Sequence, residues 1–125
     1  MQKNRLLKST SIALLLCSQL SAASLGSLLF HGNCTTCHFE TKTVSAPAVI
    51  DFREHYIRAF PKREDFVNYM SAWVANPDAK TSIMLQAIEE HGLMPQLGFD
   101  EEVLKDITGF IYDTDFTKEH EGDPY

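Results

Sequence analysis

One five-residue segment of the chain combines the residue types that carry chemistry. Cys34-Thr35-Thr36-Cys37-His38 has the C-x-x-C-H spacing that is the attachment signature for c-type haem. Two thiols three positions apart lie on one side of a helical turn, where both can add to the vinyl groups along one porphyrin edge. The imidazole of His38 then becomes the proximal iron ligand. The segment predicts one covalently bound haem c, held by thioethers from Cys34 and Cys37.

Other uses of a closely spaced cysteine pair fit this sequence less well. A zinc site needs four ligands, and the other histidines do not fall at zinc-finger spacing. A thioredoxin-like pair needs a preceding strand, whereas the Leu- and Ser-rich segment before Cys34 is typical of a helix. A disulfide between Cys34 and Cys37 would be short and strained. Haem attachment is therefore the favoured interpretation.

His38 needs an acceptor for its second ring nitrogen, because that hydrogen bond fixes the orientation of a ligating imidazole. Pro47 lies nine residues further on, in a segment without sustained periodicity. We expect the backbone carbonyl of Pro47 to receive the imidazole proton.

The opposite face of the iron needs a second ligand. Met94 lies in a loop stiffened by Pro95, where a thioether can reach a metal, and it is the expected distal ligand. Met70 and Met84 lie on amphipathic helix faces, where methionine is usually core filler. His91 is the runner-up. Two protein ligands would close the iron to oxygen, which favours one-electron transfer.

The first 23 residues predict a secretory signal peptide. They contain a basic start at Lys3, Arg5 and Lys8, an apolar stretch from Ile12 to Leu20, and small residues at 21–23. We expect cleavage after residue 23 and export to the periplasm. Export suits the predicted cofactor, because c-type haem is attached on the far side of the membrane.

A retained N-terminal membrane anchor is the alternative to cleavage. No charge appears from Ser9 through Phe30, a stretch long enough to span a bilayer. Leu25, Leu28 and Leu29, however, recur at helical spacing and have a better use as the apolar face of a mature helix. Cleavage would leave no stable membrane span.

Composition limits the remaining function classes. The chain has 125 residues, 44% hydrophobic and 22% charged, which suits one globular domain. Lys and Arg number 11 against 17 Asp and Glu, a net charge of −6 and the opposite of a nucleic-acid binder. Loss of the signal peptide removes three basic residues and makes the net charge −9. The expected partners are redox proteins with a basic docking surface.

Apolar periodicity predicts an all-α fold of about four helices and no credible strand pair. The predicted helices are Ser24–Asn33, Lys62–Ala75, a third that begins after Asp78 and ends at Gly92, and Asp100–Tyr112.

Loops and boundaries follow from the same pattern. Phe39 to Phe52 is predicted to be a loop. The domain would span residues 24–112, followed at 113–125 by an acidic tail without periodicity, which we expect to be mobile.

Four stretches together resemble a class I monohaem cytochrome c of the short bacterial type. They are Gly26-x-x-x-Phe30-x-x-x-Cys34 leading into the C-x-x-C-H segment, the loop at 41–48 with Pro47, Met94-Pro95, and Ile107–Tyr112. The resemblance implies a cytochrome c fold around one haem, with Gly26 and Phe30 packed on Ile107 and Phe110. It implies a periplasmic electron carrier rather than an enzyme.

The chain also departs from that family. Phe39 stands where a glycine often follows the haem histidine, and residues 52–90 differ from the best-known members. The propionate contacts are unassigned, with Arg53, Tyr56 and Trp73 as candidates. Two other functions stay open: a haem subunit of a periplasmic oxidoreductase complex, for example in sulfur-compound oxidation, and a five-coordinate gas-binding haem in which Met94 only packs.

Overall fold

The structure is a computed structural model that describes residues 24–118, and within this range all regular elements are helical. This confirms the all-α prediction. The predicted signal peptide at 1–23 and the end of the tail at 119–125 lie outside the described residues. The helices are α1 (Leu25–Asn33), α2 (Val49–Ala59), α3 (Arg63–Ala75), the short 3-10 helix η1 (Ala79–Thr81), α4 (Leu85–His91) and α5 (Glu101–Asp113).

Helix α2 was not predicted, and it corrects the expected loop from Phe39 to Phe52. The loop ends at Ala48, and the helix that begins at Val49 continues to Ala59. Only Val49 and Tyr56 are fully buried within it, and charged residues alternate with apolar ones along the rest of the helix. Ile50, Phe52 and Ile57 also pack on the core but are only partly buried. The apolar positions therefore form no clean stripe in the sequence, and the helix was not recognised.

The single helix predicted between Asp78 and Gly92 is two elements. The Asp78 carboxylate accepts a hydrogen bond from the Lys80 N–H and caps η1, not α4. Helix α4 begins at Leu85 and ends where Gly92 adopts a φ of 83°. The prediction located the helix end correctly and its start six residues too early.

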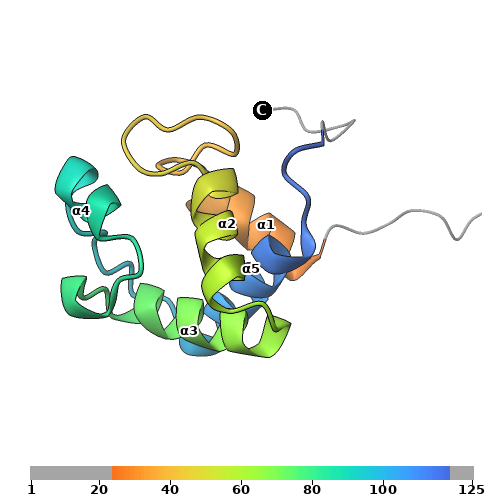
Figure 1. Cartoon of the computed structure of the whole chain (residues 1–125). Helices are drawn as coiled ribbons and strands as arrows, with labels where there is room; N and C mark the ends of the chain where they lie inside the picture. The colour runs from red at the N-terminus through yellow and green to blue at the C-terminus, as the bar shows by residue number, and fades with distance from the viewer. Residues whose placement is uncertain (1–23, 119–125) are drawn as a thin grey trace, which may run out of the picture.

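Helices α1, α3 and α5 cross to build the centre of the molecule (Figure 1). The α1–α5 crossing is close: a Cβ placed on Gly26 would lie 2.2 Å from the Asp106 carbonyl oxygen. Phe30 is fully buried beside it, with its ring centroid 5.4 Å from that of Phe110. Glycine is thus required at position 26, and the expected packing of Gly26 and Phe30 on α5 is present.

The first part of the tail belongs to the fold, contrary to the prediction of a mobile segment from residue 113. Asp113 ends α5, and Phe116 is only 3% exposed. The Phe116 ring packs 5.6 Å from Phe30 and 5.9 Å from Phe110. A single aromatic residue in an acidic segment forms no periodic pattern, so its burial could not be predicted. The packing of Phe116 nevertheless holds residues 114–118 against the core.

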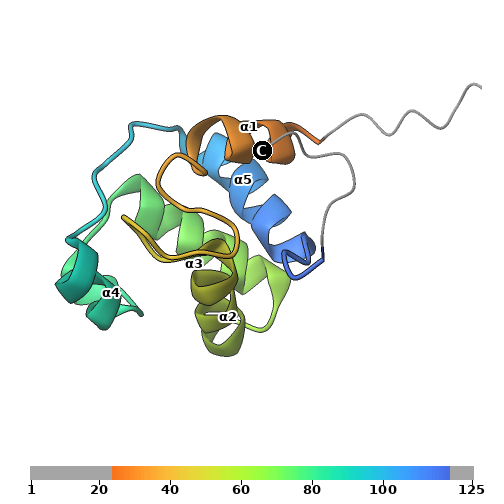
Figure 2. The same cartoon turned by 90° about the horizontal axis from the view of Figure 1, so that it is seen from above.

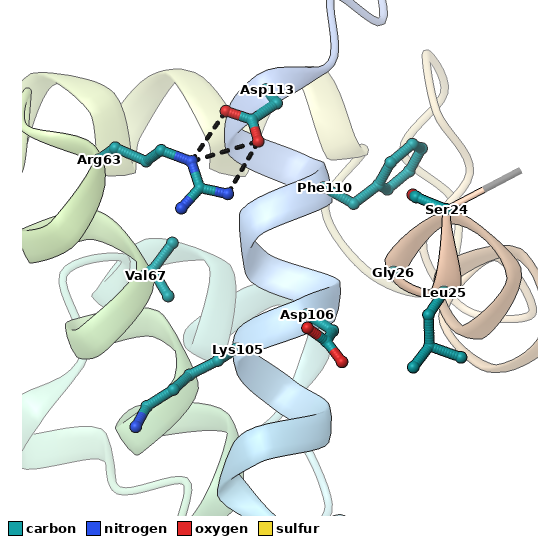
Figure 3. A pocket seen from close by; sticks show the side chains of 9 residues that line it. All are labelled: Ser24, Leu25, Gly26, Arg63, Val67, Lys105, Asp106, Phe110 and Asp113. Carbon is teal, nitrogen blue, oxygen red and sulfur yellow. Dashed lines mark hydrogen bonds and ion pairs between the residues drawn. The ribbon is translucent and has the colours of Figure 1, made fainter.

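Polar contacts join α3 to α5. The Arg63 guanidinium binds the Asp113 carboxylate through two nitrogens, at 2.9 and 2.8 Å, and lies over Gly109 (Figure 3). This contact holds the pKa of Asp113 below its usual range. Deeper in the interface, the Ser71 and Thr108 hydroxyls share a buried hydrogen bond of 2.8 Å. Both contacts fix the register of the two longest helices.

Helix α4 stands apart from the other helices (Figure 2) and has no buried residue. Hydrogen bonds hold its flanking segments instead. The Tyr69 hydroxyl donates to the Thr81 carbonyl at 2.6 Å, and the Trp73 indole donates to the Asp78 carbonyl at 3.0 Å. The Gln96 amide donates to the Ala75 carbonyl at 2.9 Å. The position of α4 is therefore set by its connections and not by its own packing.

Replacing Gly26 with alanine should destabilise the protein strongly. The added methyl would collide with the backbone of α5, which cannot move aside as a side chain can. We expect a loss of about 2–3 kcal/mol in the free energy of unfolding, the upper part of the usual cost of overpacking. Denaturant unfolding measures it.

Gly32 on the same helix is the matched control. No atom lies within 4 Å of the position of its added Cβ. Gly32→Ala should therefore be neutral or stabilising by up to ~1 kcal/mol. Equal stability of the two variants would contradict the close crossing.

Candidate functional site

The C-x-x-C-H segment continues directly from α1 as one tight turn. Cys34 caps the helix, donating its N–H to the Phe30 carbonyl at 2.8 Å. The Cys34 carbonyl then accepts the N–H groups of Cys37 at 3.2 Å and His38 at 2.9 Å. The turn therefore places Cys34, Cys37 and His38 together at the end of α1.

Both cysteines are free thiols, in different surroundings. Cys37 is exposed, whereas Cys34 is half-buried against the core. Burial, with a smaller contribution from Cys37, raises the pKa of Cys34 to about 11. Cys34 is accordingly a protonated thiol at neutral pH.

The orientation of His38 is fixed by two contacts. Its Nδ1 lies 2.8 Å from the Pro47 carbonyl oxygen and, as the donor, leaves Nε2 with the lone pair. Its ring meets Phe52 edge to face, with centroids 5.2 Å apart. Burial lowers the pKa of His38, against the opposing effect of the Pro47 hydrogen bond. The imidazole is thus held neutral, the form that ligates metals.

The loop that carries Pro47 is fastened to the start of α2. The N–H groups of Val49 and Ile50 donate to the carbonyls of Phe39 and Glu40 at 2.9 and 3.0 Å. The Thr43 hydroxyl accepts the Ala48 N–H at 3.0 Å. The unpredicted helix α2 therefore has a direct role, because its unpaired N–H groups close the loop and place the Pro47 carbonyl against His38.

The structure brings His91 into the neighbourhood of His38. Pro47 and His91 both line a cavity of about 470 Å³ between α2 and α4, and Met84 contributes to the same wall. The charge of His91 also lowers the pKa of His38, so the two imidazoles interact electrostatically. His91 is half-buried at the end of α4.

Met94 is half-buried in the segment that joins α4 to α5. This placement agrees with the predicted loop and leaves the ligand role of Met94 a prediction.

The three candidate propionate contacts have other partners. Arg53 donates to the Ile111 and Tyr112 carbonyls at 2.8 and 2.7 Å and so caps the end of α5. Tyr56 is buried in the core, which raises the pKa of its hydroxyl. Trp73 donates to the loop after α3. Each side chain thus has a structural role that its residue type alone did not indicate.

Sequence reasoning missed Phe52 and Thr43. Phe52 was assigned to a loop, although a helix starting just after Pro47 would have turned its ring toward the preceding histidine. Thr43 precedes α2 by several residues, so it escapes the usual search for a cap directly before a helix. Both were hidden by the same error, the missing helix.

The described residues contain neither a cluster of metal-binding side chains nor a membrane-spanning helix. Among residues 24–118, no three His, Cys, Asp or Glu side chains gather closely enough to hold a metal ion. No helix in the described part of the chain is long and apolar enough to cross a membrane.

The chain matches no known family model, no curated protein and no solved structure.

Thr43→Val should loosen the loop at its junction with α2. The variant keeps the shape of the side chain but removes the acceptor for the Ala48 N–H and the donor to Asp51. We expect a loss of about 1 kcal/mol in the free energy of unfolding, as for other lost caps. Thr41→Val, at an exposed position of the same loop, is the control and should change stability by less than about 0.5 kcal/mol. Equal losses would show that the Thr43 hydroxyl does not hold the loop to the start of α2.

Proposed function

We propose that the protein is a monohaem cytochrome c of class I type and acts as a periplasmic one-electron carrier. The observation that carries the proposal is the 2.8 Å contact between His38 Nδ1 and the Pro47 carbonyl, on a turn that also presents two free thiols. A dithiol redox pair has no need for a histidine held in this tautomer, and the described residues gather no further ligands to complete a zinc site. A covalently attached haem does, because the histidine must present Nε2 to iron.

The surroundings of the turn support the same proposal. Helix α4 and the segment after it expose Leu85, Leu93 and Leu97, each between 44% and 57%. Helix α4 buries none of its own residues. The predicted mature chain of 102 residues has short helices and therefore a small core. A bound porphyrin would give these exposed leucines an apolar surface to pack against.

Different residues of the chain attach the proposed haem, orient its proximal ligand and supply its distal ligand. Cys34 and Cys37 provide the thioether sulfurs, Pro47 orients His38, and Met94 is the proposed distal ligand. When bound, a haem of this kind supplies one-electron chemistry at its iron. Ligands on both faces exclude small molecules from the metal, so the chain performs electron transfer without a substrate of its own. The negative charge of the mature chain favours partners with a basic docking surface.

A haem-bearing subunit of an oxidoreductase complex is the second candidate. Leu25 and Leu28 are exposed side by side on the outer face of α1, where a carrier that acts alone would usually place polar residues. The mass of the native assembly distinguishes the two functions, because a carrier stays monomeric and a subunit co-purifies with its partner.

Covalent haem is tested by mass and absorption of the mature protein. Made in a haem-maturing host, the wild type should be coloured and heavier than the bare chain by one haem. Changing both Cys34 and Cys37 to alanine should remove both properties. Cys17→Ala, in the predicted signal peptide, is the control and should change neither. A colourless wild-type protein with the mass of the bare chain would refute the proposal.

The distal ligand is tested by comparing three variants. Met94→Ala should remove the weak sulfur-to-iron absorption band and lower the reduction potential by on the order of 0.1 V or more, since axial ligands set potentials over a range of roughly 0.8 V. It should also let carbon monoxide bind the ferrous protein. Met84→Ala is the control and should keep the wild-type spectrum. If His91→Ala and not Met94→Ala changes the spectrum, His91 is the ligand.

A further inference from the structure

His31 links the core to the loop that orients His38. The residue lies in the last turn of α1, between the attachment segment and the α1–α5 crossing. Its Nδ1 is 2.9 Å from the Ser27 carbonyl oxygen, and its Nε2 is 3.3 Å from Glu40 Oε1. The Ser27 hydroxyl oxygen lies 3.4 Å from the same Nδ1. Glu40 lies two residues after His38, so the contact joins α1 to the start of the loop.

The ring of His31 is held firmly at its core end. It meets Phe30 edge to face at 5.1 Å and Phe110 at 5.7 Å between centroids. Phe30 is fully buried, and Phe110 belongs to α5. His31 therefore takes its position from the α1–α5 packing and not from the loop.

The loop, in contrast, has few anchors of its own. From Phe39 to Ser45, Glu40 is the one residue that is not exposed. Even Phe39, where the related family often has glycine, points to solvent. Backbone hydrogen bonds and the Thr43 hydroxyl hold one side of the loop to α2, and the Ser45 hydroxyl donates to the Cys37 carbonyl at 3.4 Å. The contact between His31 and Glu40 holds the start of the loop to α1.

We infer that His31 and Glu40 are positioning residues for the proximal ligand. By fixing Glu40 against the core, the pair limits opening of the loop and keeps the Pro47 carbonyl on His38 Nδ1. The inference rests on the proposed function, because it assigns the pair to the orientation of a haem ligand. Neither side chain touches the iron or takes part in covalent attachment.

The test measures loop opening in the haem-bound protein. In the reduced, diamagnetic state, hydrogen exchange of the His38 Nδ1–H reports directly on breakage of its bond to Pro47. We expect exchange about three- to fivefold faster in His31→Ala and in Glu40→Ala, the scale expected for the loss of one partly exposed side-chain contact. Glu40→Gln keeps an acceptor for His31 and should restore most of the protection.

His55 provides a matched control on α2. Its Nδ1 lies 2.8 Å from the carbonyl oxygen of Asp51, four residues earlier in the helix. His31 makes the same kind of contact with Ser27, but His55 is exposed. His55→Ala should leave the exchange of the His38 proton unchanged. Amides in the middle of α5 report on global unfolding, and in every variant their exchange should change less than that of the His38 proton, which separates loop opening from a loss of overall stability.

The double variant completes the test. If the pair acts as one contact, His31→Ala combined with Glu40→Ala should exchange no faster than either single variant. Additive effects, or His31→Ala behaving like His55→Ala, would overturn the inference while the haem spectrum stayed intact. Absence of haem from the wild type would instead refute the proposed function.

Discussion

The approach of α1 to α5 at Gly26 is the constraint on which the rest of the structure depends. Helix α1 has nine residues and cannot be stable alone, so it takes its position from the helix it crosses. A hydrogen atom in place of a side chain lets the Asp106 carbonyl come within 2.2 Å of where a Cβ would lie. Phe30 then fills the core one turn later, and Cys34 follows as the cap of the same helix. The turn with the two thiols is thus placed by packing that lies outside it.

Helix α5 also fixes the positions of α2 and α3, because an arginine from each of them binds its C-terminal end. Arg53 of α2 binds the last carbonyls of α5, and Arg63 of α3 binds the carboxylate of Asp113. Because α2 is fixed in this way, its first N–H groups can close the loop and hold Pro47 against His38. One helix therefore positions both halves of the proposed proximal site: the imidazole through α1 and the carbonyl through α2.

The sequence predicted what depends on local spacing and missed what depends on distant contacts. The turn at Cys34, the His38–Pro47 hydrogen bond and the ends of α1, α3 and α5 follow from motifs and periodicity. Helix α2 was missed because only Val49 and Tyr56 of it are buried. The burial of Phe116 depends on Phe30 and Phe110, which no local pattern brings together. Arg53 looked like a surface or propionate residue because its acceptors are carbonyls nearly sixty residues away.

Helix α4 differs from the other α-helices because it has no fully buried residue, and this difference bears on the proposed function. None of its seven residues is fully buried, yet hydrogen bonds from Tyr69, Trp73 and Gln96 hold both of its connections in place. A short helix kept at a distance from the core gains no stability from apolar burial within the chain. It becomes favourable when a second apolar surface lies between it and the His38 turn. The cavity shared by Pro47 and His91 lies on that side of α4. In the proposed cytochrome, α4 would form the distal wall of the haem site, opposite the His38 turn that the α1–α5 crossing positions.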